Sequence, residues 1–163
     1  MNIQAKLSNT GKIIITILIC EATGIFSATL SGPANNSWFD SLVKPEWNPP
    51  GYLFGPVWTV LYLLMGVSLG IIWCYKTNES NKKNAYSLFA FQLFLNFWWS
   101  IIFFNFHSPA FAFLTIVVML MAILFTIISF SRFSKLAAWL LVPYIAWVSF
   151  ASFLNLTIWN LNR

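Results

Sequence analysis

The chain alternates five long apolar runs with short polar stretches. Each run is long enough to cross a hydrocarbon core of about 30 Å, which takes about 20 helical residues. The runs are apolar on nearly every side, whereas the strands of a membrane barrel are shorter and alternate strictly. The pattern therefore predicts an all-α integral membrane protein, a five-helix bundle with a long structured first loop and spans at residues 12–30, 52–75, 85–106, 111–130 and 136–159.

The composition agrees with this class. Of the 163 residues, 59% are apolar and only 8% are charged, whereas about a quarter of the residues in a soluble domain are charged. Too few polar side chains are present to coat a globule that faces water, and the length fits one membrane domain over residues 1–163. The net charge of +5 comes from basic residues that are scattered over loops, which argues against a nucleic-acid partner.

The N-terminal lysines and the apolar run after them resemble a signal peptide. However, Glu21 interrupts the run and the apolar character then resumes to Leu30, so a retained first helix is favoured. Cys20 and Cys74 both lie within apolar runs, and we expect small buried hydrophobes rather than a disulfide. The sequence has no cluster of His and Cys at metal-ligand spacing, so no metal site is expected.

Lysine and arginine concentrate on alternate loops. The first loop has only Lys44, the third has none, and the C-terminus has only Arg163. The N-terminal tail and the second and fourth loops carry Lys6, Lys12, Lys76, Lys82, Lys83, Arg132 and Lys135. The positive-inside rule then predicts a cytoplasmic N-terminus and a C-terminus on the outside, in what we expect to be the cytoplasmic (inner) membrane.

The first loop, residues 31–51, is rich in proline and tryptophan. It holds two tryptophans and four prolines, namely Trp38, Trp47, Pro33, Pro45, Pro49 and Pro50. Because proline fixes the backbone, the loop is interpreted as a lid over the mouth of the bundle. The alternative is an aromatic belt at the level of the lipid headgroups, where tryptophan is common.

Three of the predicted helices each carry a tryptophan in line with polar or small residues. Polar residues in a membrane helix avoid lipid, so the amides, and the tryptophans on the same faces, should point inward. This predicts an aromatic pocket at the bundle centre, beside a last helix that Pro143 kinks. In the alternative, the amides only fasten helices together and the indoles only fill the core. The faces at helical spacing are Trp58, Tyr62, Met65 and Leu69; Gln92, Asn96, Trp99 and Phe103; and Pro143, Trp147, Ala151 and Asn155.

Three other features are less specific. Glu21 is the only acid inside a predicted span, which makes it a functional candidate, but a structural role is favoured because no basic partner lies within the membrane. Gly66 and Gly70 form a GxxxG pair that suits either packing within the chain or a dimer. His107, the sole histidine, lies in a loop and cannot supply the paired axial ligands of a haem carrier.

Three stretches, in this order along the chain, resemble the TSPO/MBR family, the tryptophan-rich sensory proteins that include the translocator protein, or peripheral benzodiazepine receptor. They are residues 38–65, the Gln-Leu-Phe-Leu-Asn-Phe-Trp-Trp of 92–99 and the Trp-Leu-Leu-Val-Pro-Tyr-Ile-Ala-Trp-Val-Ser-Phe-Ala of 139–151. The resemblance covers nearly the whole chain and is to bacterial-type members. It implies a five-helix bundle, usually a homodimer, with helices in the order one, two, five, four, three around a pocket that the first loop closes.

The same resemblance implies binding of porphyrins, such as protoporphyrin IX and haem, and of synthetic isoquinoline and benzodiazepine ligands, with no cofactor required. The sterol motif of animal members is incomplete here, where Leu156, Thr157 and Asn160 stand near the end of the last helix. The family's pocket corresponds to Trp38, Trp47, Asn48, Pro49, Pro50, Trp58, Tyr62, Asn96, Trp99, Trp147 and Ala151.

The function expected from residues and resemblance together is that of a membrane receptor or sensor for tetrapyrroles. The sequence has no Ser/His/Asp set, no carboxylate pair in a cleft and no phosphate-binding loop, so an enzyme is the weaker hypothesis. Light-dependent degradation of the porphyrin, which the resemblance implies for some bacterial members, would use Trp58 and Trp147. Porphyrin transport is the third hypothesis.

Overall fold

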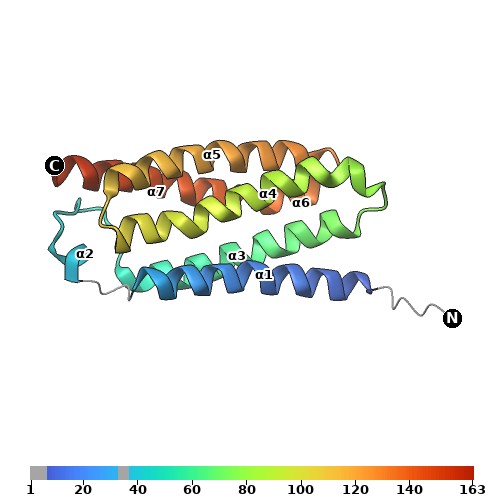
Figure 1. Ribbon diagram of the computed structural model, residues 1–163, viewed down its shortest axis with the longest axis horizontal. Coiled ribbons are helices and arrows are strands. Elements are labelled where there is room, and N and C mark those ends of the chain that lie inside the picture. The colour runs from blue at the N-terminus through green and yellow to red at the C-terminus, as the bar shows by residue number, and fades with distance from the viewer. Residues whose placement is uncertain (1–6, 33–36) are drawn as a thin grey trace.

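The computed structural model describes residues 7–32 and 37–163, which form an elongated bundle of helices without a strand in that part of the chain (Figure 1). Five of its helical spans are long and apolar enough to cross a membrane, so the prediction of an all-α, five-helix integral membrane protein is confirmed. The elements are α1 (Asn9–Ser31), α2 (Ser37–Ser41), α3 (Gly51–Cys74), α4 (Glu79–Ser100), the π-helical turn η1 (Ile101–Asn105), α5 (Pro109–Ser131), α6 (Lys135–Leu140) and α7 (Val142–Leu161).

The helices α1 and α4 begin several residues before their apolar runs do, because polar residues cap them. The Ser8 side chain accepts a hydrogen bond from the backbone N–H of Gly11 at 3.0 Å. Asn78 caps α4 in the same way, so this helix begins at Glu79 and not at residue 85, where the apolar run starts. Such caps satisfy backbone donors that have no partner in the first turn, and hydropathy alone does not detect them.

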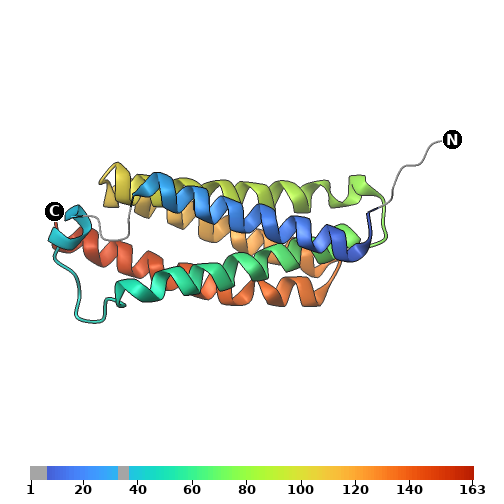
Figure 2. The same cartoon turned by 90° about the horizontal axis from the view of Figure 1, so that it is seen from below.

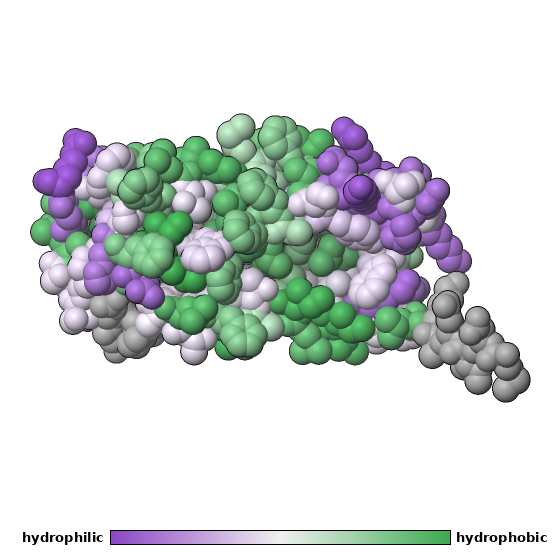
Figure 3. Space-filling view, viewed as in Figure 1, coloured by the Kyte–Doolittle hydropathy of each residue, from purple (hydrophilic) through white to green (hydrophobic). Residues whose placement is uncertain are grey.

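The five spans form a ring in which α1 packs against α3 and α4, α3 against α6 and α7, and α5 against α4, α6 and α7. This is the order one, two, five, four, three that the resemblance implies. Because the number of spans is odd, α1 begins at one end of the bundle and α7 ends at the other (Figure 1). On the face drawn in Figure 3, hydrophobic residues cover the middle and hydrophilic ones gather at the two ends, as expected for a protein that crosses a bilayer.

Two glycines of α3 allow α1 to approach closely. A Cβ atom at Gly66 would lie 2.4 Å from the Cα of Ile17, and one at Gly70 would lie 2.8 Å from the Cα of Ile13. The Thr16 hydroxyl donates a hydrogen bond to the Gly66 carbonyl at 2.8 Å. The GxxxG pair therefore serves packing within the chain. Figure 2 shows α1 and α3 separating from this contact toward the end that carries the first loop.

Two spans are irregular. The last span breaks at Leu141, between α6 and α7, and Pro143 is the second residue of α7. Pro143 was expected to kink this span, and the irregularity is a break two residues before it. Proline has no backbone N–H and so cannot continue the hydrogen bonds of a helix. At the end of α4, the backbone N–H of Phe106 bonds to the carbonyl of Ile101 at 3.0 Å, a π-type turn of the kind that is frequent at functional sites.

The first loop lies at the end of the bundle where α7 ends (Figure 1). The Val43 N–H donates to the side-chain oxygen of Asn162 at 2.9 Å, and the amide nitrogen of Asn162 donates to the Val43 carbonyl at 2.9 Å. These two bonds fasten the loop to the end of α7, so the loop is structured as predicted. Pro33, one of its four prolines, lies outside the described residues, as does Lys6 of the N-terminal tail.

The cysteines are free thiols, with Cys20 fully buried and Cys74 partly buried, and the expectation that they form no disulfide is confirmed. The basic residues of the second and fourth loops lie at the end of the bundle where α1 begins (Figure 1). This grouping has the asymmetry that the positive-inside rule describes. Which side of a membrane this end faces stays a prediction.

Candidate ligand-binding site

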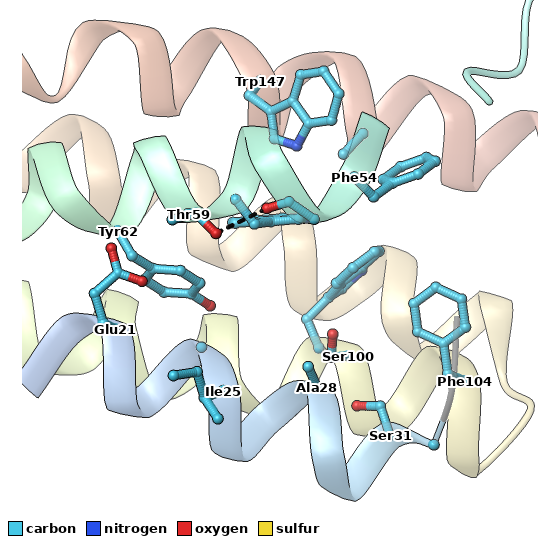
Figure 4. Close-up of a pocket in the computed structure, with 16 residues that line it drawn as sticks. Glu21, Ile25, Ala28, Ser31, Phe54, Thr59, Tyr62, Ser100, Phe104 and Trp147 are labelled. Atoms are coloured by element: carbon cyan, nitrogen blue, oxygen red, sulfur yellow. Dashed lines mark hydrogen bonds between the residues drawn. The ribbon is translucent and has the colours of Figure 1, made fainter. Parts of the chain in front are cut away.

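A cavity of about 290 Å³ lies among four of the five spans, toward the end that carries the first loop (Figure 4). It occupies the space where α1 and α3 have separated beyond their glycine contact, and α4 with η1 and α7 complete its walls. The cavity is open at its edge, since the lining residue Ile25 is 64% exposed. It is lined by Glu21, Gly24, Ile25, Ala28, Ser31, Gly32, Phe54, Gly55, Trp58, Thr59, Tyr62, Trp99, Ser100, Phe104, Trp147 and Ala151.

Six of the sixteen lining residues are aromatic, and they come from three spans. The rings of Trp58 and Tyr62, one turn apart on α3, lie 5.6 Å apart between centroids. The ring of Phe54 meets Trp147 of α7 edge to face at 6.0 Å, and Trp99 stacks on Phe103 at 5.6 Å. Contacts of this kind fix the rings and so present rigid apolar faces at low entropic cost.

Hydrogen bonds behind the wall hold Tyr62 in place. Its hydroxyl donates to the side-chain oxygen of Asn96 on α4, and the Asn96 amide nitrogen donates to the hydroxyl of Tyr144 on α7 at 3.0 Å. The Tyr144 hydroxyl in turn lies 3.6 Å from the sulfur of Met119 on α5. Four spans are therefore joined through one buried chain of polar side chains, and Asn96 supports the cavity from behind without lining it.

Trp99 is held by a second buried amide. Its indole N–H donates to the side-chain oxygen of Asn155 on α7 at 3.2 Å, and the Asn155 amide nitrogen donates to the Pro109 carbonyl at 2.9 Å. The prediction that Gln92, Asn96 and Asn155 point inward is confirmed, since all three are almost fully buried. Asn96 and Asn155 also fasten helices together, as the alternative interpretation held, whereas neither polar atom of Gln92 has a partner.

An indole N–H and a carboxyl group of the lining are left for a ligand. The indole nitrogen of Trp147 is buried without a hydrogen-bond partner and faces the cavity in Figure 4. Glu21 on α1 lies beside the ring of Tyr62, at the end of the cavity away from Phe104 (Figure 4). The hydroxyls of Ser31 and Thr59 are already used, because each donates to a backbone carbonyl four residues earlier in its helix. The cavity thus offers an acidic group and at least one buried free donor.

The structure brings five of the residues predicted for the pocket together around the cavity, namely Trp58, Tyr62, Trp99, Trp147 and Ala151. The other six, which are Trp38, Trp47, Asn48, Pro49, Pro50 and Asn96, do not line it.

Trp47 stacks on the exposed ring of Phe153 at 5.3 Å and is itself 43% exposed. Trp38 stacks on His107 at 4.4 Å, beside η1. The described loop residues from Ser37 to Pro50 therefore lie at the end of the bundle without lining the cavity (Figure 1), and the role of the first loop as a lid stays a prediction.

The sequence interpretation missed the wall that α1 contributes. Four lining residues of α1 lie three or four apart on one face, and they are one acid and three small residues: Glu21, Gly24, Ala28 and Ser31. Small residues leave space where bulky ones would fill it. The helical spacing of these small residues, with an acid one turn away, is the feature of the sequence from which this wall could have been predicted.

The relationships of the chain to known proteins agree with this geometry. Residues 16–160 match the model of the TspO/MBR family. The tryptophan-rich protein TspO of Chlorobaculum tepidum is 45% identical over 152 residues, covering 91% of this chain and 94% of its own length. The TspO protein of Archaeoglobus fulgidus is 37% identical, over 94% and 99% of the two chains. The human translocator protein is 35% identical, over 77% and 75%. By its sequence and its five membrane-spanning helices, the chain belongs to the TspO/MBR family.

Proposed function

We propose that the protein is a membrane receptor or sensor that binds tetrapyrroles, such as protoporphyrin IX or haem, in this cavity. Membership of the family supports a sensor or receptor role in general terms. The observation that carries the finer proposal is that Trp58, Trp99 and Trp147, from three different spans, meet around one space.

The lining suits a flat, mostly apolar ligand with a polar edge. Aromatic faces stack on a macrocycle, and the unpaired indole N–H of Trp147 supplies a donor for a carboxylate or carbonyl of the ligand. The cavity volume of about 290 Å³ is at the low end of the range for ligand sites. A macrocycle would therefore extend through the open edge beside Ile25, toward the acyl chains.

The binding test uses the purified protein in lipid nanodiscs, titrated with protoporphyrin IX and followed by porphyrin absorbance. Replacing Trp58 and Trp147 together by Phe removes two indole faces and the free donor, and we expect the affinity to fall about tenfold or more. The matched control replaces Trp98 and Trp139, which are 37% and 69% exposed and lie outside the cavity, and should leave the affinity unchanged. Equal affinities in both double variants would reject this cavity as the porphyrin site.

Degradation of the bound porphyrin under light is a second candidate function, and one observation favours it. Trp58 and Trp147, the two residues that would carry the chemistry, both line the cavity, so both would lie against a bound pigment. The test is illumination of the complex with measurement of the loss of porphyrin absorbance. If the porphyrin bound to the protein is lost no faster than free porphyrin in empty nanodiscs, the protein does not degrade its ligand, and the receptor function alone is left.

We further propose that the protein lies in the cytoplasmic membrane with its N-terminus in the cytoplasm. The grouping of Lys76, Lys83, Arg132 and Lys135 at one end of the bundle supports this orientation through the positive-inside rule. We also propose, from the resemblance to the family, that two copies form a homodimer. Light scattering on the protein in detergent measures the mass of the particle and so distinguishes a homodimer from a monomer.

A further inference from the structure

Glu21 is in an unusual position for an acid of a membrane protein. The chain has four acids, of which Asp40 and Glu46 lie in the first loop. Glu79 begins α4 and forms an ion pair with Lys82 at 2.8 Å. Only Glu21 lies in the middle of a span, on α1, and there it lines the cavity. An acid at such depth is costly unless something pairs with it.

Nothing in the described part of the chain pairs with Glu21. The two ion pairs found there are Lys44–Asp40 and Lys82–Glu79, and Lys12, the lysine of α1, lies over the ring of Trp73. Two hydroxyls of this region are also used: that of Tyr62, whose ring lies beside Glu21 (Figure 4), donates to Asn96, and that of Thr23 donates to the carbonyl of Ile19 at 2.8 Å. Within the described residues this carboxyl group is therefore free to pair with a ligand in the cavity.

The surroundings of Glu21 favour a positively charged partner. The carboxyl group lies beside the ring of Tyr62 (Figure 4), and the ring of Trp58 follows 5.6 Å away between centroids. The faces of both rings attract cations. A carboxyl group and an ammonium or N–H donor form a charge-assisted hydrogen bond, the stronger kind in an apolar medium. Carboxyl group and ring faces thus select the same ligand chemistry, although they belong to different helices.

We propose that the cavity binds a second class of ligand, flat aromatic cations that carry an N–H donor, with the cationic nitrogen against Glu21 and the rings against Trp58 and Tyr62. This class goes beyond tetrapyrroles and uses different atoms of the cavity. A carboxylate at the edge of a tetrapyrrole accepts a hydrogen bond from the indole N–H of Trp147 and is repelled by Glu21. A cationic nitrogen at the edge of the second kind of ligand is attracted by Glu21. The larger part of the specificity of the cavity for cations then resides in one side chain, that of Glu21, and the ring faces of Trp58 and Tyr62 add a smaller part.

The test compares two fluorescent ligands that share a three-ring skeleton. At neutral pH, 9-aminoacridine is a cation with N–H donors, while acridine is neutral and offers only an acceptor nitrogen. Binding is measured by fluorescence anisotropy to the full chain in nanodiscs of zwitterionic lipid, with empty nanodiscs as the blank. We expect the wild-type protein to bind 9-aminoacridine about tenfold more tightly than acridine, the ratio that one charge-assisted hydrogen bond provides.

Two variants isolate the carboxyl group. Glu21→Gln keeps the shape and removes the charge, and Glu21→Leu also removes the acceptor. Both should lower the affinity ratio severalfold, to the smaller preference that the ring faces alone provide, while the affinity for acridine stays constant, which also shows that the cavity is intact. The matched control is Glu46→Gln, the same chemical change at an exposed residue of the first loop, and it should keep the wild-type ratio.

The proposal is overturned if the wild-type ratio is close to one, if 9-aminoacridine fails to bind, or if both Glu21 variants keep the wild-type ratio. An equal loss of both ligands in the variants also overturns it, because that result assigns Glu21 a structural role. Protoporphyrin IX is titrated in parallel. A protein that selects the aminoacridine but ignores the porphyrin refutes the tetrapyrrole proposal alone, and the reverse result refutes only the cation proposal.

Discussion

Tyr62 on α3 donates its hydroxyl hydrogen to the side-chain oxygen of Asn96 on α4, directly behind the cavity. The pair joins two helices that do not follow each other in the ring of spans, and Asn96 extends the link to Tyr144 of α7. Both residues of the pair are almost fully buried. One face of the Tyr62 ring meets the cavity while its hydroxyl is held from behind, so the shape of the cavity depends on this bond.

Replacing Tyr62 by Phe tests the bond. The ring stays and the hydroxyl is lost, which leaves the Asn96 oxygen buried without its donor. A buried acceptor without a partner costs about 1–3 kcal/mol, so we expect the free energy of unfolding to fall by this amount in a titration with denaturing detergent. Tyr52→Phe is the control, because Tyr52 is 77% exposed, and it should change little. Equal stabilities of the two variants would contradict the role given to the pair.

The contact between α1 and α3 makes a second prediction. A methyl group at Gly66 would lie 2.4 Å from the Cα of Ile17, so Gly66→Ala must push the helices apart. Such overpacking costs about 1–3 kcal/mol. Gly55 lies on the same helix with no atom near the position of a Cβ, so Gly55→Ala should be neutral or slightly stabilising. Thermal unfolding of both variants measures the difference; a stable Gly66→Ala protein would show that the backbones can separate freely.

Much of this arrangement could be predicted from the sequence, because it follows from local chemistry. Hydropathy located the spans, and the amides Asn96 and Asn155, which are buried as expected, oriented the faces that carry Trp99 and Trp147. These inferences succeed because the amides must leave the lipid whichever helices are their neighbours.

The rest depends on how distant segments meet, and a one-dimensional pattern does not contain that information. Trp47 was placed in the pocket by resemblance, but it stacks on Phe153 at the outer side of α7. The wall from α1 depends on where α1 separates from α3, beyond the contact at Gly66. Small residues such as Gly24 and Ala28 become a cavity wall only when that separation leaves space in front of them.

The orientation in the membrane is a third prediction. In a background with both cysteines replaced by Ser, single cysteines are placed at Ser131, at the end of the bundle rich in basic residues, and at Asn160, at the opposite end; both positions are exposed. A maleimide that does not cross membranes should label Asn160→Cys on intact cells, and Ser131→Cys only after the cells are opened, because lysine and arginine are retained in the cytoplasm. The opposite labelling would invert the proposed topology.

The last prediction concerns the space inside the cavity. Ala151 lines it from α7 and is 8% exposed, so Ala151→Leu places a larger side chain where the ligand would lie. We expect the affinity for protoporphyrin IX to fall about tenfold or more, since the added atoms displace ring contacts. Ala146→Leu adds the same atoms at an exposed position of the same helix and should not change binding. If Ala151→Leu bound the porphyrin as the wild type does, the ligand would have to lie elsewhere, because the new side chain and a macrocycle cannot occupy the same volume.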